Sequence, residues 1–329
     1  MPTCRHRPLK GGAQVGRTWP CRPLAGLGIA GLAVVVTLSQ SCAAQPEAAA
    51  RNEPPQVEYV GTHIWHMPHE DFGGFSAIEI EDDGTRFTAL SDRATMRWGR
   101  IERGDDGRIA KMVPEGHTRL KDSRGRALKP GWVGDSEGIA IGKDGKIWVS
   151  FEGLTRVARY DTHTSNATPL PRPQEFKKMQ RNSSLEALAI TDDGTLLTLP
   201  ERSGALGTPF PVWRFRDGKW DQPFSIPRSG DWLAVGADMG PDGRFYLLER
   251  DFLGLLGFRT RVRRFDLGPD GFSNEQILLS SYPLQYDNLE GISVWEDEQG
   301  IRLTMISDDN FSRLQRTELV EYRVTEDKP

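Results

Sequence analysis

Residues 184–201 read SLEALAITDDGTLLTLPE, and the fold class can be inferred from this segment and its repeats. Apolar residues alternate in its first half, as in a strand with one buried face. Asp193-Gly194 follows, a dipeptide typical of tight hairpin turns. A second apolar run then ends at the acid Glu201. The stretch therefore predicts a β-hairpin with one acid, Glu186, near the start of its first strand and another at the end of its second.

The same hairpin recurs along the chain. Its turn glycines lie at positions 84, 145, 194, 243 and 300, so the spacings are 61, 49, 49 and 57 residues. Most copies are followed by a third strand in which arginine alternates with aliphatic or aromatic residues, as in Arg156–Tyr160 and Arg261–Phe265. A fourth, less regular strand precedes the next copy. Four antiparallel strands in each repeat of about fifty residues are typical of β-propeller blades.

We therefore predict an all-β fold, a propeller of five four-stranded blades over residues 57–325. The last copy lacks a fourth strand, and the strand-like segment Val57–Trp65 precedes the first copy. We expect this N-terminal strand to supply the missing one and to close the ring. Two alternatives stay open on the sequence alone: a sixth blade hidden in the longer spacings, and a β-sandwich, which explains the regular repeat less well.

Residues 1–44 differ from the rest and are predicted to be a signal peptide. They carry five basic residues and no acidic one, then an apolar run, Leu24–Leu38, that is too short for a comfortable membrane span. Small residues follow around Cys42, in a pattern that resembles a bacterial lipoprotein signal whose cysteine is lipidated. Ordinary cleavage after Ala43 or Ala44 is the alternative, and an uncleaved anchor is less favoured. Residues 45–56 are expected to form a flexible tether.

The leader also contains all three cysteines, Cys4, Cys21 and Cys42, so we expect no disulfide in the mature domain. Without the leader the 42 basic residues fall to 37 against 46 acidic ones, a net charge near −9. An acidic domain without a basic tract is a poor candidate for nucleic-acid binding. We therefore expect an exported monomer of the periplasm or cell envelope that contacts the membrane only through a lipid on Cys42.

Acidic residues recur at two positions of the repeat. One lies near the start of the first strand (Glu137, Glu186 and Glu290), and the other at the end of the second strand (Asp92, Glu152, Glu201, Glu249 and Asp308). Both positions lie opposite the hairpin turn, so the topology predicts that the carboxylates converge around one mouth of the central channel. Such a ring needs compensation by a cation or by arginines. Salt bridges that pin adjacent blades together are the alternative interpretation.

Four segments resemble a known family: Asp135–Ile139 (DSEGI), Ser184–Leu188 (SLEAL), Asn288–Ile292 (NLEGI) and Ser307–Phe311 (SDDNF). They resemble the phytase-like domain family, named for the esterase-like activity of phytase, over about residues 57–325. The resemblance implies a propeller exported to the bacterial envelope, distantly similar to calcium-dependent propeller phytases. The same patterns are similar to propeller lactonases of the gluconolactonase type, which hold one divalent metal in the channel.

Two functions follow as hypotheses. The first is a metal-dependent hydrolase of a phosphate or carboxylic ester, in which Glu137, Glu186, Glu290 and Asp308 hold Ca²⁺. The residues expected to contact the substrate are Asp92, Arg93, Glu152, Glu201, Arg202, Glu249, Arg250, Asp309 and Asn310. The second is a non-catalytic propeller that offers the acidic mouth to a ligand, an envelope polymer or a partner. The sequence names no catalytic nucleophile.

The leader yields the first prediction. Cells that express the full chain should incorporate labelled palmitate into it, and Cys42→Ser should abolish the label, because this sulfur would carry the lipid. An exported chain without label would indicate ordinary cleavage. A full-length cytoplasmic protein that keeps Met1 would contradict the signal peptide itself, and cell fractionation with N-terminal sequencing distinguishes these outcomes.

Overall fold

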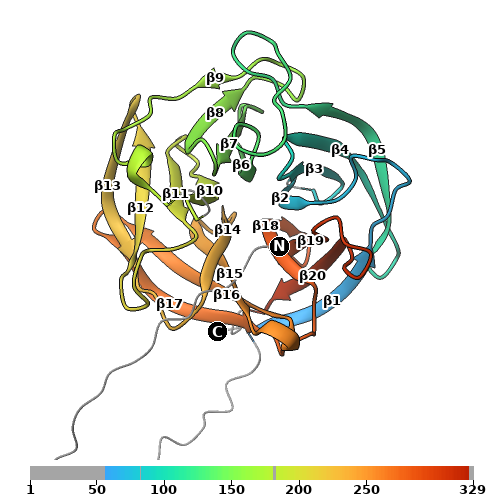
Figure 1. The fold of residues 1–329 in the computed structure, drawn as a ribbon. Helices are drawn as coiled ribbons and strands as arrows, with labels where there is room; N and C mark the ends of the chain where they lie inside the picture. Colours follow the sequence, from blue (N-terminus) through green and yellow to red (C-terminus); the bar gives the residue numbers. More distant parts are fainter. Residues whose placement is uncertain (1–55, 82, 181–182, 326–329) are drawn as a thin grey trace, which may run out of the picture. The chain divides into compact units, whose positions relative to one another are not determined.

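The computed structural model describes residues 56–81, 83–180 and 183–325. They form five four-stranded antiparallel sheets, arranged as blades around a central channel (Figure 1). The predicted five-bladed propeller is therefore confirmed. The predicted signal peptide 1–44, with Cys42, and the tether as far as residue 55 lie outside the described residues.

Each blade runs from an inner strand at the channel to an outer strand at the rim. Blade one comprises β2 (Phe75–Ile80), β3 (Arg86–Ser91), β4 (Thr95–Arg103) and β5 (Ile109–Arg119). Blade two comprises β6 (Ser136–Ile141), β7 (Ile147–Phe151), β8 (Arg156–Tyr160) and β9 (Thr168–Pro169). Blade three comprises β10 (Leu185–Ile190), β11 (Leu196–Pro200), β12 (Phe210–Arg216) and β13 (Lys219–Ile226).

The last two blades have longer strands. Blade four comprises β14 (Leu233–Met239), β15 (Arg244–Phe252), β16 (Phe258–Gly268) and β17 (Gly271–Ser280). Blade five comprises β18 (Asn288–Asp297), β19 (Gly300–Asp308), β20 (Glu318–Val324) and β1 (Val57–Ile64). Two short 3-10 helices, η1 (Phe176–Lys178) and η2 (Gly254–Leu256), lie in connections. Among the described residues, no helix has the length and apolar character needed to cross a membrane.

The N-terminal strand closes the ring, as predicted. β1 pairs antiparallel with β20, so that Val57 lies opposite Val324 and Ile64 lies opposite Glu318 (Figure 1). This pairing covers the edge that blade five would otherwise leave open, and an open edge is a site for aggregation. Val57 also packs in the same buried cluster as Tyr322. The closing strand therefore contributes backbone hydrogen bonds and part of the core.

Apolar side chains hold blade five against blade one. The alternation seen in the sequence turns one side of each strand toward the neighbouring sheet. One buried cluster contains Ile78 and Phe87 from blade one, Trp295 and Ile306 from blade five, and Trp65 from the segment that follows β1. The seam at which the ring closes is thus packed as a hydrophobic core.

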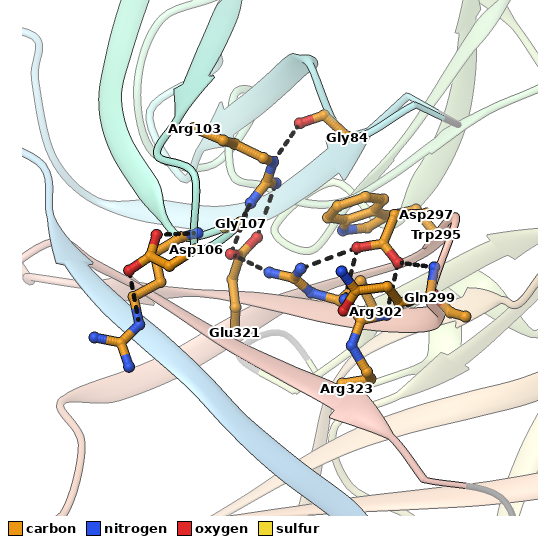
Figure 2. Close-up of polar contacts among 12 residues, drawn as sticks. Gly84, Arg103, Asp106, Gly107, Trp295, Asp297, Gln299, Arg302, Glu321 and Arg323 are labelled. Carbon is orange, nitrogen blue, oxygen red and sulfur yellow. Dashed lines mark hydrogen bonds and ion pairs between the residues drawn. The ribbon is translucent and has the colours of Figure 1, made fainter.

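A network of buried ion pairs crosses the same seam (Figure 2). Glu321 of β20 accepts two hydrogen bonds from Arg103 of blade one, at 2.9 and 3.0 Å, and one from Arg302 at 2.7 Å. The side chains of Glu321 and Arg302 are only 2% and 1% exposed. Both guanidinium groups lie over the ring of Trp295. Gly84 has a φ of +71°, and a Cβ there would meet that ring at 2.2 Å, so only glycine fits this turn.

Loss of the charge on Glu321 should weaken this seam. Glu321→Gln removes a buried counter-charge from Arg103 and Arg302, which should cost about 3 kcal/mol of the free energy of unfolding. A lower midpoint in denaturant titration measures the loss. Glu115→Gln is the matched control, because Glu115 pairs with arginines near solvent and should cost less than about 1 kcal/mol. Equal midpoints for Glu321→Gln and its parent would show that the network does not hold the seam.

Candidate functional site

All five inner strands carry a β-bulge at the same place, near the end opposite the hairpin turn. The residue at the bulge in blades one to five is Ser76, Glu137, Glu186, Val235 and Glu290, respectively. A bulge inserts an extra residue and re-aims its side chain. Three bulges carry glutamate, so they bring the glutamates of the predicted ring to one end of the channel. We call that end the mouth, and the face of the ring around it the mouth face.

The residue two places before each bulge lies opposite the end of the second strand. In blade two, for example, the amide of Glu152 donates to the carbonyl of Asp135 at 2.9 Å. At the end of the second strand, the position that Glu152 holds in blade two, blades one to five carry Asp92, Glu152, Glu201, Arg250 and Asp308. Four of them are acids expected from the sequence. Blade four has an arginine instead.

The expectation for Glu249 is wrong by one residue. Glu249 lies opposite Ala234, one place away from the position that the other acids share. Because a shift of one residue turns a side chain to the other face of a sheet, Glu249 points away from the mouth. It is fully buried inside blade four and accepts hydrogen bonds from Arg261 at 2.7 Å and from Arg263 at 3.1 Å. Glu249 therefore stabilises the blade.

Arg250 occupies the position in its place and gathers carboxylates from both neighbouring blades. Its guanidinium donates to Glu290 and, at 3.1 Å, to Glu201. Asn288 accepts a third hydrogen bond from it at 2.8 Å and in turn donates to Glu290 at 2.8 Å. Burial lowers the pKa of Arg250, but Glu290 and Glu201 raise it above its ordinary value overall. Glu201 and Glu290 are thus compensated within the fold.

Asp135, Glu137 and Glu152 form a second, different group. Among the described residues they are the only three His, Cys, Asp or Glu side chains that each place a ligand atom within 4.8 Å of the others. Glu137 belongs to the set expected to bind a metal, whereas Asp135 does not. We call these three residues the carboxylate triad. Glu186 adjoins it through a hydrogen bond with Glu152.

Burial and mutual repulsion raise the pKa values of several carboxyls at the mouth. Burial, with repulsion from Glu290 and Asp135, raises the pKa of Glu137 well above its ordinary value. Burial chiefly raises the pKa of Asp308 to about 8 and that of Glu152 to about 7. The mouth thus holds more carboxyl groups than its arginines neutralise. Bound protons or a metal ion must neutralise the carboxylates that the arginines do not pair with.

Two exposed arginines lie at the rim of the mouth. Arg93 follows Asp92 and stacks on Phe311, with its guanidinium carbon 3.2 Å from the ring centroid. Arg202 pairs with Glu201 at 3.2 Å. Both arginines can therefore meet a ligand that approaches from the mouth face.

Asp309 and Asn310 shape the loop beside the mouth. Asp309 accepts hydrogen bonds from the amides of Gly74 and Phe311, at 2.9 and 3.0 Å. The Asn310 side chain is exposed, while the backbone amide of Asn310 donates to the Asp308 carboxylate at 2.6 Å. Asp309 therefore stabilises the loop. Asp308 is the residue of this segment that belongs to the mouth.

Apolar side chains narrow the channel beneath the mouth. A cavity of about 10 Å³ lies there, roughly the room for one water, and its lining includes Ala77, Ile139, Leu188, Ala237 and Ile292. This cavity, which also borders Glu137, has no room for a ligand larger than water.

Two acids further along the inner strands were not predicted. Asp238 of β14 accepts hydrogen bonds from the amides of Met239 and Val294 at 2.7 and 2.6 Å. Burial raises its pKa to about 7, and burial together with Asp238 raises the pKa of Glu79 in β2. Each acid interrupts the apolar pattern of its strand, which is the signal that could have marked it. Asp135 was not predicted as a site residue because the equivalent residues in the other blades are not acids.

Comparisons with known proteins give a family but no curated relative. The solved structures that resemble this chain include PQQ-bound aldose sugar dehydrogenase from Streptomyces coelicolor, at 12% identity and a TM-score of 0.45, covering 80% of this chain and 98% of that one. A virginiamycin B lyase from Staphylococcus aureus matches at 14% identity and a TM-score of 0.40, covering 80% and 99%. Sequence identities and TM-scores this low indicate nothing about function.

No curated protein sequence matches the chain. The family model Phytase-like, described as esterase-like activity of phytase, matches residues 70–311, which is more than half of the chain. The match contains the four segments that suggested this family and all five bulges. The chain therefore belongs to the Phytase-like family.

Proposed function

We propose that this protein is a metal-dependent hydrolase of a phosphate or carboxylic ester that acts at the acidic mouth. The observation that carries the proposal is the carboxylate triad, whose oxygens lie within 4.8 Å of one another in a mouth with an excess of carboxyl groups. The family description, esterase-like activity of phytase, supports the reaction class. We further propose that the protein acts as an exported monomer in the periplasm or cell envelope, which the leader supports.

The triad fits a hard divalent cation such as Ca²⁺. Ca²⁺ binds oxygen ligands at about 2.3–2.6 Å, so two ligand oxygens on one ion are at most about 5 Å apart. The 4.8 Å limit on the triad lies within that range. Carboxylates are also the donors that hard cations prefer. The residues present therefore match the chemistry of such an ion.

The proposed ligands differ from the set expected from the sequence. Glu137 remains, and Asp135 and Glu152 join it. Glu290 is less available, because Arg250 and Asn288 engage it. The three expected ligands that lie outside the triad, Glu186, Glu290 and Asp308, stay in the mouth as its neighbours.

Residues of the chain can perform the remaining steps. A divalent cation, when bound, would polarise the ester and lower the pKa of a water molecule. Burial and the neighbouring Glu137 raise the pKa of Glu186 well above its ordinary value. A raised pKa favours the protonated carboxyl, which is the form that can donate a proton to the leaving oxygen. Arg93 and Arg202 can bind a phosphate or carboxylate of the substrate from the rim.

Calcium should support both stability and turnover, and Glu137→Gln should remove both effects. At a hundred times its dissociation constant, a metal ion stabilises the folded state by about 2.7 kcal/mol. The variant keeps the shape of the side chain but loses one charged ligand, so its melting temperature should not respond to calcium. Its hydrolysis of p-nitrophenyl esters and phosphates should fall to a small fraction of the parental rate. Glu296→Gln, an exposed residue away from the mouth, is the matched control.

Melting curves with calcium and with chelator decide between the interpretations of the mouth. Without metal, Glu137→Gln should be at least as stable as the parent, because a repulsive charge has gone. A parent that does not respond to chelator would end the metal proposal. Calcium stabilisation without turnover of any ester in the panel would favour the non-catalytic binding propeller.

The metal-free protein should lose stability as the pH rises from about 4 to about 8. The pKa values of Asp308 and Glu152 are about 8 and about 7 in the fold, and near 4 when unfolded. The folded state therefore binds more protons across this window, so its advantage is complete below pH 4 and is lost as the pH rises through the folded values. Thermal midpoints at several pH values in chelator measure the slope, which Asp308→Asn should reduce. A parental midpoint that rises over this window would contradict the raised pKa values.

A further inference from the structure

We propose that the mouth face docks on a lipid surface through apolar loop tips that surround the acidic mouth. The proposal concerns the loops and holds whether or not the mouth is catalytic. From the sequence, membrane contact was expected only through a lipid on Cys42. The mouth face offers a second contact, made by the folded domain itself.

Exposed apolar side chains gather at this face. The described part of the chain has twelve exposed large hydrophobic residues, and nine of them lie in connections at the mouth face or at the ends of strands that lead into them. Trp132, Leu206, Leu255, Tyr282 and Leu314 each mark one of these connections. The other three lie in the outer strands β1 and β17. Single exposed apolar residues are common, but their segregation to one face indicates an interaction surface.

The opposite face is polar. Its connections include tight turns such as Asp83-Gly84, Asp144-Gly145, Asp193-Gly194 and Asp242-Gly243. The acids of the last three turns form ion pairs with Lys146, Arg216 and Arg244. None of the twelve exposed hydrophobic residues lies on these turns. The described domain therefore has one polar face and one face with protruding apolar tips.

The hairpin between β15 and β16 forms the most prominent tip. The two strands stay paired beyond Arg250 as far as Phe252 and Phe258, whose rings lie 4.9 Å apart. The turn η2 follows, and there Leu255 is fully exposed and Leu256 more than half exposed. Side chains exposed to this degree become buried only if a partner covers them.

A neighbouring connection, residues 281–287, extends this surface. The amide of Leu284 donates to the carbonyl of Phe258 at 3.1 Å, so the two segments lie side by side. Gly257 has a φ of +68°, and a Cβ there would come within 2.5 Å of Leu284, so glycine permits the contact. Tyr282 is 81% exposed beside them. We call Phe252, Leu255, Leu256, Tyr282 and Leu284 the apolar tip patch.

Basic residues accompany the tips. The pairs that lie within four residues of each other in the chain are Lys129 with Trp132, Arg202 with Leu206, Arg259 with Leu255, and Arg313 with Leu314. Apolar side chains flanked by lysine or arginine are typical of segments that lie in the membrane interface. Two of these cations, Arg202 and Arg259, form ion pairs with Glu201 and Asp251. Docking by the mouth face therefore depends mainly on the apolar tips, and the charges of the rim contribute less.

A lipid surface fits these tips better than a protein partner does. A stable protein interface has a continuous apolar core with charged residues confined to its rim. Here the apolar tip patch lies on one side of the charged mouth, and the remaining tips, at Trp132, Leu206 and Leu314, lie in connections of other blades. A fluid bilayer can accommodate separate tips individually, and the amphipathic rings of Trp132 and Tyr282 suit the level of the headgroups.

Hydrogen–deuterium exchange of the full chain with vesicles of phosphatidylcholine and phosphatidylglycerol tests the proposal. Peptides that cover residues 252–258 and 281–287 should exchange more slowly when the vesicles are present. Peptides that cover the turns at 142–146 and 191–195 should not change, and they serve as controls within the same sample. This comparison locates the contact whatever the leader or a lipid on Cys42 contributes to binding. Protection of the control turns, or none at the tips, would overturn the proposal.

Variants of the patch give a second measurement. Leu255→Ser/Leu256→Ser should weaken vesicle binding about ten-fold, because two exposed leucines no longer enter the lipid. Ile277→Ser, half-exposed in the outer strand β17, is the matched control and should bind like the parent. The melting temperatures should agree among the three chains. Unchanged binding of the double variant would contradict docking by the tips, as would tip protection that appears without vesicles when the protein is concentrated, which would indicate a second copy of this chain.

Discussion

Closure of the ring is the constraint on which the rest of this structure depends. The pairing of β1 with β20 joins the two ends of the propeller, and the buried cluster around Trp295 and the network at Glu321 hold the last blade against the first. Only in a closed ring do all five inner strands converge. Convergence places Glu137 and Glu290, which are far apart in the chain, close enough to repel each other. Closure therefore adds the charges of the other blades to a carboxylate triad that lies within blade two.

This convergence creates an electrostatic cost that the fold offsets unevenly. Arg250 neutralises the side of the mouth near Glu201 and Glu290, whereas Asp135, Glu137 and Glu152 have carboxyl neighbours instead. Raised pKa values are the response of carboxyls that lack a counter-charge. The same imbalance that weakens the metal-free fold is what would attract a divalent cation, so stability and function are coupled at this one place.

The two faces of the ring have different chemistry because they are made by different connections. Tight Asp-Gly turns join the first and second strands of most blades, and they leave no room for apolar side chains at their end of the ring. The connections at the mouth face are longer and can carry exposed leucine and tryptophan. A substrate for the proposed hydrolase would thus reach the carboxylates from the same side as the proposed lipid contact. This arrangement suits an ester presented at a membrane surface.

The sequence alone predicted five blades, the closing strand and most of the mouth acids, because all three follow from a period of about fifty residues and the alternation of strands. A sixth blade and a β-sandwich stayed open until the strands were seen to pair into five sheets. The sequence could not determine which acids act together. Glu249 and Arg250 are adjacent in the chain, and only the strand register shows that the arginine reaches the mouth. Likewise, Asp135 joins the triad because a bulge and two strand ends meet there. The register of paired strands and the position of a bulge are properties of the folded sheet, and no local pattern of residues encodes them.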